Sequence, residues 1–368
     1  MKPPPLPAFQ AATNPEAPAI ADDSISLTAV NADDPAEMLS DVPTAELAAL
    51  EMFAGVPTAD LAALASELDP LRAAPGEELM RQGEPALSFL IIASGRTEIR
   101  HTRPNNVTTV TEVSPGQIVG EIAMLRHAPR TATVIAIDDL HAYVGSECAF
   151  TALLEIPDMA EKLLRMARQR LAALITPVPI RLRDGTELYL RPVLPGDGKR
   201  VLTSHVWFSP ETHYRRYLSA CTPNEALLNY LSDVDYVDHF VWVVTDGVDG
   251  PVVADARFVR DEHDPTLAEV AFTVADVYQA RGLGTILLGA LTVAAHMDGI
   301  ERLHARVLAD NAPARALLDR AHVQWDRDEP GVVNATAAVP DPDDLPVDSL
   351  EEIRDTARQV VEDPSTKN

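Results

Sequence analysis

The sequence feature that most constrains the fold is an apolar segment that runs into a glycine-containing turn and then into a helical pattern. Residues 267–274 have the apolar character of a strand, and residues 286–297 repeat apolar side chains at helical spacing. Between them, Gly282 and Gly284 let the backbone approach a ligand, because glycine has no Cβ. The free N–H groups and the dipole of the helix N-terminus favour an anion there. The sequence therefore predicts a strand, an anion-binding turn and a helix.

The flanking segments predict an α/β domain around this unit, over residues 181–339. A hairpin is expected over 181–191, with its turn at Asp184-Gly185, and a mixed segment with short helices over 197–236. The remaining elements are expected as strands at 240–245, 252–259, 302–308, 323–325 and 332–338 and a helix at 313–321.

The N-terminal half has a different texture, with short strand-like segments between glycine turns. Strands are expected at 87–93, 97–102, 107–113, 131–137 and 141–144. Regular short strands of this kind predict a small antiparallel barrel or jelly roll, and helical spacing at 43–68 and 148–175 adds flanking helices. The first domain is therefore predicted over 43–176, with a proline linker over 177–180. The predicted fold class is α+β with two domains.

The two ends of the chain are acidic and weakly periodic. Residues 1–42 are predicted to be a disordered tail, and residues 340–368 an acidic tail with a helix near 347–361. The net charge of −26 argues against nucleic-acid partners and anionic membrane surfaces. Without a signal peptide or an apolar run of about 18 residues, we expect a soluble cytoplasmic protein. Two cysteines and scattered histidines predict neither a disulfide framework nor a metal site.

A charged motif lies within the strand-rich half. It reads Gly120-Glu121-Ile122-Ala123, followed by Pro129-Arg130-Thr131-Ala132. A cyclic nucleotide asks for such a pair, because an arginine can hold its phosphodiester bidentately and a carboxylate can accept from its ribose hydroxyl. Two such residues alone would more often be a surface ion pair beside a turn.

The whole string is more specific and resembles the phosphate-binding cassette of cyclic-nucleotide-binding domains. The resemblance implies that Glu121 binds the ribose and Arg130 the phosphate. It further implies contacts from the backbone or hydroxyl groups of Gly120, Ile122, Ala123, Thr131 and Ala132. The trailing helix would cover the purine, with Arg165, Arg168 and Arg170 as candidates and Arg170 preferred. Cyclic AMP is the expected ligand, although Thr131 could also contact the amino group of cyclic GMP.

The string Gln279-Ala280-Arg281-Gly282-Leu283-Gly284-Thr285 resembles the pyrophosphate loop of GNAT acetyltransferases. That resemblance implies acetyl-CoA as co-substrate, held by these seven residues, with its pantetheine arm along Ala271, Phe272 and Thr273. Downstream, Asn311 would touch the pantetheine arm and Arg315 a phosphate. Asn311 followed by Pro313 also fits a plain helix cap, and both interpretations can hold.

Acetyl transfer to an amine needs a base, and Glu269 is the candidate. It lies in the apolar strand ten positions before Gln279, where desolvation would raise the pKa of its carboxyl toward neutrality. A solvent-facing glutamate is the alternative, and the resemblance favours the base. The tyrosine that many family members use as leaving-group acid is missing, since the corresponding helix contains Leu317-Leu318-Asp319-Arg320.

The segment over about 197–236 is expected to act as a lid, in which His205, more than His213, would contact Glu269 in the resting state. The order of sensor, linker and transferase resembles actinobacterial cyclic-AMP-regulated protein lysine acetyltransferases. It implies cyclic-AMP-activated acetylation of lysines on protein acceptors, such as acyl-CoA synthetases or universal stress proteins. Two alternatives stay open, a non-enzymatic nucleotide sensor with a degenerate acetyltransferase-like domain and an enzyme for small-molecule amines.

Overall fold

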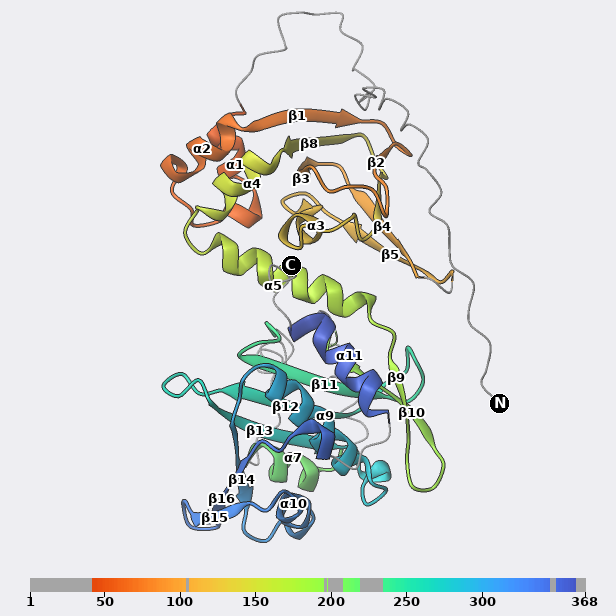
Figure 1. Cartoon of the computed structure of the whole chain (residues 1–368), viewed down its shortest axis with the longest axis vertical. Coiled ribbons are helices and arrows are strands. Elements are labelled where there is room, and N and C mark those ends of the chain that lie inside the picture. Colours follow the sequence, from red (N-terminus) through yellow and green to blue (C-terminus); the bar gives the residue numbers. More distant parts are fainter. Residues whose placement is uncertain are drawn as a thin grey trace, which may run out of the picture. The chain divides into compact units, whose positions relative to one another are not determined.

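The computed structural model describes residues 42–103, 106–194, 197, 208–218, 234–344 and 349–361 (Figure 1). The predicted N-terminal tail, His205 and most of the predicted lid lie outside these residues.

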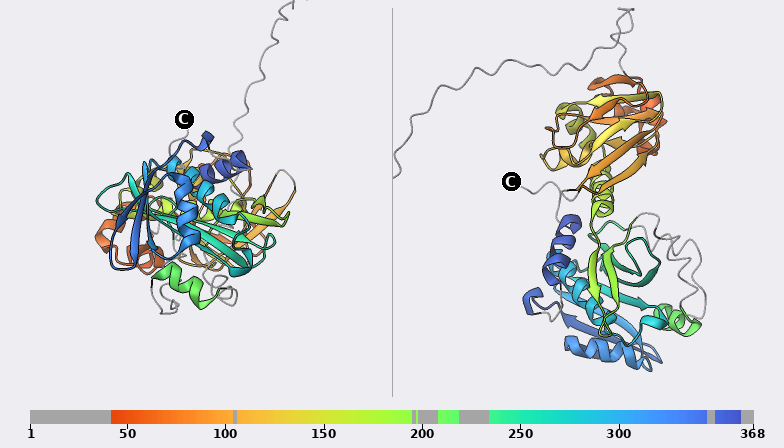
Figure 2. Two further views of the ribbon diagram at one scale, coloured as in Figure 1. Left: turned by 90° about the horizontal axis from the view of Figure 1, so that it is seen from below. Right: turned by 90° about the vertical axis from the view of Figure 1, so that its right-hand side faces the viewer.

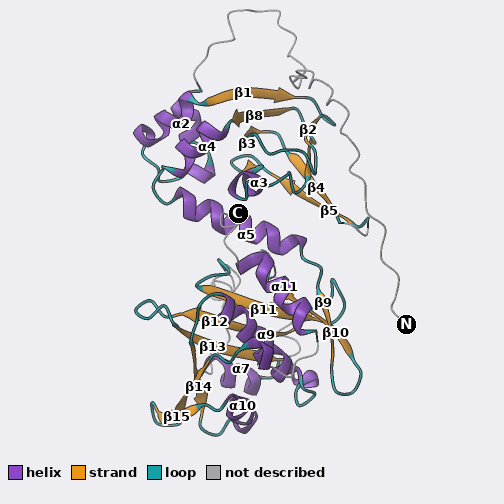
Figure 3. Ribbon diagram, in the orientation of Figure 1, coloured by secondary structure: helices purple, strands orange, loops and turns teal. Residues whose placement is uncertain are grey.

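Two four-stranded antiparallel sheets form the strand-rich half (Figure 3). Their strand orders are β1-β8-β3-β6 and β2-β7-β4-β5. Their strands are β1 Leu68–Ala73, β2 Glu78–Met80, β3 Phe89–Ser94, β4 Thr97–Thr102, β5 Thr108–Val113, β6 Ile118–Val119, β7 Thr133–Ala136 and β8 Leu140–Gly145. Buried side chains from both sheets, including Met80 and Ile92, share one apolar core. The predicted jelly roll is confirmed.

Short helices flank these sheets and form a second cluster around Phe53 and Leu163. They are α1 Thr44–Ala48, η1 Glu51–Phe53, η2 Thr58–Leu61, α2 Ala62–Ser66, α3 Glu121–Leu125, α4 Glu147–Leu154 and α5 Met159–Leu174. Strand β1 was not predicted, because Pro70 interrupts its pattern. It is an edge strand, where proline needs no ladder partner for its nitrogen.

The second half is built on an eight-stranded mixed sheet of order β15-β16-β14-β13-β12-β11-β10-β9. The strands are β9 Val178–Arg181, β10 Glu187–Pro192, β11 His239–Thr245, β12 Val252–Arg260, β13 Leu267–Val274, β14 Arg302–Leu308, β15 Gln324–Arg327 and β16 Val332–Ala338. The predicted linker over 177–180 is therefore wrong at its C-terminal end. Val178 and Ile180 are buried as alternate residues of β9, and the two prolines only mimic a break.

Helices cover both faces of this sheet (Figure 2). They are α7 Pro210–Tyr217, η4 Asp276–Tyr278, α9 Leu283–Met297, α10 Ala312–Leu318, η5 Asp319–Ala321, η6 Pro342–Asp344 and α11 Leu350–Val361. Helix α9 packs on β11, where the buried Trp242 indole donates from Nε1 to the Ala290 carbonyl at 2.9 Å. Helix α7 lies on the opposite face from α9.

Helix α11 corresponds to the helix predicted near 347–361 within the acidic C-terminal segment. Its Ile353, Ala357 and Val360 are fully buried in the same core as α9. Acidic residues fill the other side of the helix, so its composition looks like a tail while its periodicity is that of a packed helix. Within the described residues, no helix is long and apolar enough to cross a bilayer, and no three potential metal ligands gather.

Candidate functional site

The central strand β13 separates from its neighbour halfway along its length. It pairs with β14 in parallel only at Leu267↔Arg302, Ala268↔Leu303 and Glu269↔His304. Its other edge stays paired with β12 as far as Val274. The β14-facing edge of residues 270–274 is therefore open, and its backbone N–H and C=O groups can pair with an extended ligand.

A cavity of about 700 Å³ fills the gap between these two strands. Ten of the residues predicted to bind acetyl-CoA or catalyse transfer line it, namely Glu269, Ala271, Phe272, Thr273, Gln279, Ala280, Gly282, Gly284, Thr285 and Asn311. Asn311 also caps α10 by accepting from the Ala314 N–H at 3.3 Å. Its two predicted interpretations are therefore compatible in one structure.

The turn between β13 and α9 depends on its two glycines for different reasons. Gly282 has φ +99° and precedes the first residue of α9, so it supplies the left-handed turn. Gly284 lies inside α9, and an added Cβ would come within 3.2 Å of Leu317 on α10. The absence of a Cβ at Gly284 therefore allows α9 to pack closely against α10. From the sequence, both glycines were expected to allow the close approach of a ligand.

Three predicted ligand residues turn their side chains away from the cavity. Arg281 donates from Nε to Asp184 at 2.6 Å and lies at the β9–β10 hairpin. Leu283 is buried in the core beneath α9. Arg315 donates to the Ala309 carbonyl and stacks 5.0 Å over the Trp325 ring. Arg281 and Leu283 still contribute their backbone to the turn that borders the cavity, whereas Arg315 lies on α10.

Glu269 occupies the last paired position before the strands separate. Glu269 is exposed at this cavity, so the expectation that the apolar strand would bury it is wrong and the solvent-facing alternative is the one observed. The directly paired residue is His304, so their side chains share one face of the sheet. Glu269 therefore lies where the cavity between β13 and β14 begins, and it is one of the residues that line this cavity.

Sequence reasoning did not identify the residues that α7 contributes to the cavity. Arg216 donates from Nε to the Thr273 hydroxyl at 3.2 Å, and its guanidinium lies 5.1 Å over the Tyr217 ring. Burial, reinforced by nearby Arg257, lowers the pKa of Arg216. Burial also raises the pKa of the Tyr217 phenol. The sequence signal for these two residues was the Arg-Arg-Tyr string at 215–217, within the segment predicted to act as a lid.

The start of α7 is tied to the glycine turn through Asp276. This carboxylate accepts from the Ser209 N–H at 2.7 Å, the Ser209 hydroxyl at 2.9 Å and the Thr212 hydroxyl at 2.8 Å. Gln279 adds a hydrogen bond from its amide to Thr212 at 3.2 Å. The segment that covers the cavity and the turn that forms its floor are thus directly connected.

The charged motif of the strand-rich half forms a second, separate site. Arg130 is 7% exposed and donates to the Ser88 hydroxyl at 3.1 Å and the Gly120 carbonyl at 3.3 Å. Burial lowers the pKa of this guanidinium. Gly120 has φ +90°, and an added Cβ would lie 2.7 Å from Arg130 Nη1. The glycine therefore gives the arginine room beside the start of α3.

Glu121 is 1% exposed and is held by the helix that follows the sheets. Arg170 on α5 donates from Nη1 to Glu121 Oε1 at 2.5 Å and to the Ile118 carbonyl at 2.7 Å. Among the three arginines predicted on this helix, Arg170 contacts the motif, and it does so through the Glu121 carboxylate. The remaining motif residues lie beside this pair, with Ile122, Ala123 and Ala132 buried and Thr131 half-buried.

Comparisons with known proteins match both halves. The sequence profile of the "Cyclic nucleotide-binding domain" family matches residues 70–156, and that of the "Acetyltransferase (GNAT) domain" family matches residues 187–324. The acetyltransferase Pat of Mycolicibacterium smegmatis is 51% identical over 325 residues, which cover 88% of this chain and 98% of the relative.

Two further matches have lower sequence identity or cover a smaller share of the two chains. A solved cAMP-binding acyltransferase from Mycobacterium smegmatis has 47% identity, covers 89% of this chain and 98% of its own, and gives a TM-score of 0.47. A cAMP-dependent protein kinase regulatory subunit from Mycosarcoma maydis is 38% identical over 96 residues, 25% of this chain and 18% of the relative.

Proposed function

This chain belongs to the family of the acetyltransferase Pat, and from that membership we propose that it transfers an acetyl group from acetyl-CoA to lysine ε-amines of protein acceptors under the control of cyclic AMP. Acyl-CoA synthetases and universal stress proteins are the acceptor classes we propose. The observation that supports this most directly is the open edge of β13, which begins right after Glu269 and ends at the glycine turn.

The mechanism follows from the order of groups along this edge. The open backbone of residues 271–273 pairs with the amides of the pantetheine arm, and the turn at 279–285 holds the pyrophosphate. The acceptor amine enters at the strand separation, where Glu269 takes its proton as the nitrogen attacks the thioester carbon. The tetrahedral intermediate then expels CoA as its thiolate, so no covalent enzyme intermediate is needed.

The phenol of Tyr217 lines the same cavity and is the group we assign to protonate the leaving thiolate. It stands in for the tyrosine that α10 lacks, and it comes from α7 on the covering side of the cavity. Arg216, stacked on its ring, favours the phenolate that forms transiently when the proton leaves.

Control by cyclic AMP is proposed to act through Glu121 and Arg130. The ribose hydroxyl would bind the carboxylate that Arg170 now holds, so the nucleotide competes with an ion pair anchored on α5. A ligand can shift a conformational equilibrium only by its difference in affinity for the two states. In the proposed resting state His205, from the covering segment, occupies the amine position at Glu269.

Acetylation of a purified protein acceptor tests the proposal. We expect Glu269→Gln to lower kcat/KM by about a hundredfold or more at saturating cyclic AMP, the usual range for loss of a general base. Glu262→Gln, an exposed glutamate in the loop before β13, is the matched control and should behave as wild type. Equal rates for wild type and Glu269→Gln would refute the assignment, and activity confined to small amines would refute the acceptor class.

A further inference from the structure

A second cavity of about 430 Å³ lies on the other side of the glycine turn from the acetyl-CoA groove. It is bounded by the β9–β10 hairpin, the start of α9 and Ser349 at the start of α11. Both cavities share Arg183, Gly282 and Thr285 as lining residues. The turn that we assign to the pyrophosphate therefore separates two cavities, and only the first of them has a proposed ligand so far.

Arg183 lies across this shared wall. Its backbone N–H donates to the Arg281 carbonyl at 3.2 Å, which fastens the hairpin to the turn. Its side chain lies flat on Gly282, since an added Cβ there would meet Arg183 Cγ and Nε at 3.2 Å each. A ligand that follows the turn must pass this side chain.

The charge of Arg183 is available to a ligand, in contrast to its neighbours. Arg281 is paired with Asp184 at 2.6 Å, and Arg181 lies 3.8 Å from Glu187. No ion pair or side-chain hydrogen bond joins Arg183 to any residue in the described part of the chain, and the side chain is exposed. An exposed guanidinium beside a cavity, held in place by packing and not by a carboxylate, presents its donors to an anion.

We propose that Arg183 binds the 3′-phosphate of acetyl-CoA and that the second cavity receives the nucleotide end of this co-substrate. The inference rests on the proposed function. With the pantetheine arm in the first cavity and the pyrophosphate on the turn, the nucleotide part of acetyl-CoA extends past Gly282 into the second cavity. The 3′-phosphate is a phosphomonoester with a charge of about −1.5 to −2 at neutral pH, and an arginine fork matches its geometry.

The charge balance of the molecule favours a local cation at this point. The chain carries a net charge of −26, which repels a polyanionic co-substrate at long range. The backbone of the turn offers partial charges to the pyrophosphate, but the phosphomonoester needs a full charge of its own. Among the residues shared by both cavities, Arg183 is the cation.

Calorimetric titration of the full chain with CoA and with 3′-dephospho-CoA tests this. We expect wild type to bind CoA about tenfold or more tightly than 3′-dephospho-CoA, in line with a lost charge-assisted hydrogen bond. Arg183→Gln should lower the affinity for CoA to that for 3′-dephospho-CoA and leave the latter unchanged, which also shows that the variant is folded. Arg183→Lys should restore part of the difference, since it keeps the charge but not the fork.

Two control variants test whether the preference for CoA depends on Arg183 specifically. Arg327→Gln removes an exposed arginine of β15 that lines neither cavity, and it should keep the preference of wild type for CoA. If Arg181→Gln loses the preference and Arg183→Gln keeps it, the assignment is overturned. Equal affinity of wild type for both ligands overturns it as well, while the proposed function survives. If wild type binds neither ligand, the proposed function itself fails, and this inference with it.

Discussion

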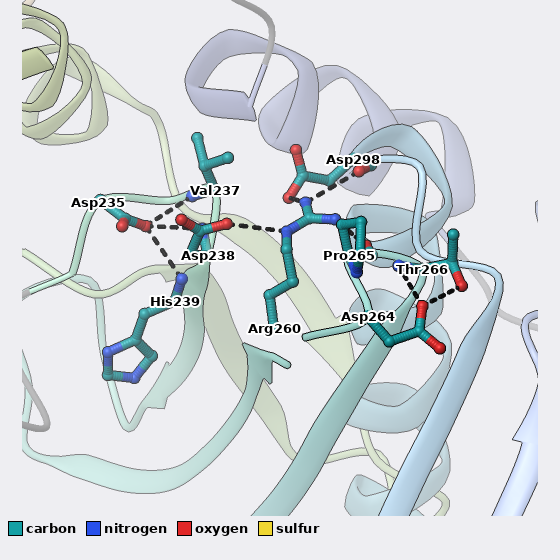
Figure 4. Close-up of polar contacts among 9 residues, drawn as sticks. All are labelled: Asp235, Val237, Asp238, His239, Arg260, Asp264, Pro265, Thr266 and Asp298. Carbon is teal, nitrogen blue, oxygen red and sulfur yellow. Dashed lines mark hydrogen bonds and ion pairs between the residues drawn. The ribbon is translucent and has the colours of Figure 1, made fainter. Parts of the chain in front are cut away.

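Replacing Asp298 by asparagine should remove a pH dependence from the stability of the α/β half. Asp298 follows α9 and lies in a polar cluster around Arg260 at the end of β12 (Figure 4). Arg260 donates from Nη2 to the Asp298 carbonyl at 3.0 Å and to its carboxylate at 2.5 Å. From Nε it donates to Asp238 at 2.8 Å, and a further bond goes to the Pro265 carbonyl.

Burial raises the pKa of the Asp298 carboxyl from 3.8 to about 7. Arg260 and, from α5, Arg168 oppose this rise, whereas the charge of Asp238 adds to it. Because the folded state holds the proton more tightly than the unfolded state, this group's stabilising contribution is complete below about pH 4 and is lost as the pH rises through about 7. At about 1.4 kcal/mol per pH unit, the loss is at most about 4 kcal/mol over the whole range and about 2–3 kcal/mol between about pH 5 and pH 8.

Urea unfolding followed by tryptophan fluorescence measures this effect, because all three tryptophans lie after residue 200 and report on the α/β half. We expect the free energy of unfolding of wild type to fall, relative to Asp298→Asn, by about 2–3 kcal/mol between about pH 5 and pH 8. Asp264→Asn is the contrasting control. Hydrogen bonds from Thr266 lower the pKa of Asp264, so its contribution is lost as the pH falls. Parallel pH profiles for wild type and Asp298→Asn would refute the reasoning.

Two further predictions concern the acetyl-CoA groove. Gly282→Ala places a Cβ at φ +99° and against Arg183, a strain of about 1–3 kcal/mol, so we expect about tenfold or weaker CoA binding by calorimetry. Unchanged affinity would show that the turn does not hold the pyrophosphate. Tyr217→Phe should lower kcat by about tenfold or more in a single-turnover assay while changing the affinity for acetyl-CoA little. An unchanged rate would leave the thiolate to depart without this acid.

The parts of the fold that the sequence predicted well are those whose pattern is local. Strands β4, β13, β14 and β16 have the predicted bounds, because each is a short segment between turns in which apolar or β-branched residues recur. Strand β9 was taken for a linker, although Val178 and Ile180 point into the core. Alternating prolines and apolar residues fit both an exposed linker and an edge strand, and only the partner β10 decides between them.

The same division between local and distant information applies to the site. The turn at 279–285 was predicted because strand, glycines and helix follow one another in sequence. Arg183, Arg216 and Tyr217 were not assigned to the groove, because they lie roughly 60 to 100 residues before that turn and reach the groove only through sheet pairing and the packing of α7. A solvent-facing Glu269 was only the less favoured alternative for a related reason, since the gap that exposes it is a property of two strands and not of one.

Helix α5 gives the two sites a physical connection that neither motif predicts. Arg170 pairs with Glu121 of the charged motif, while Ala172 and Ile175, within five residues, are buried in the core of the α/β half. Gln169 donates to the Val234 carbonyl at 3.2 Å, and Arg168 contributes to the electrostatics of Asp298. A ligand that binds Glu121 and breaks its ion pair with Arg170 therefore acts on α5, whose C-terminal end is buried in the core of the α/β half. Its effect on transfer is limited by the free energy of that ion pair and of the contacts that α5 exchanges.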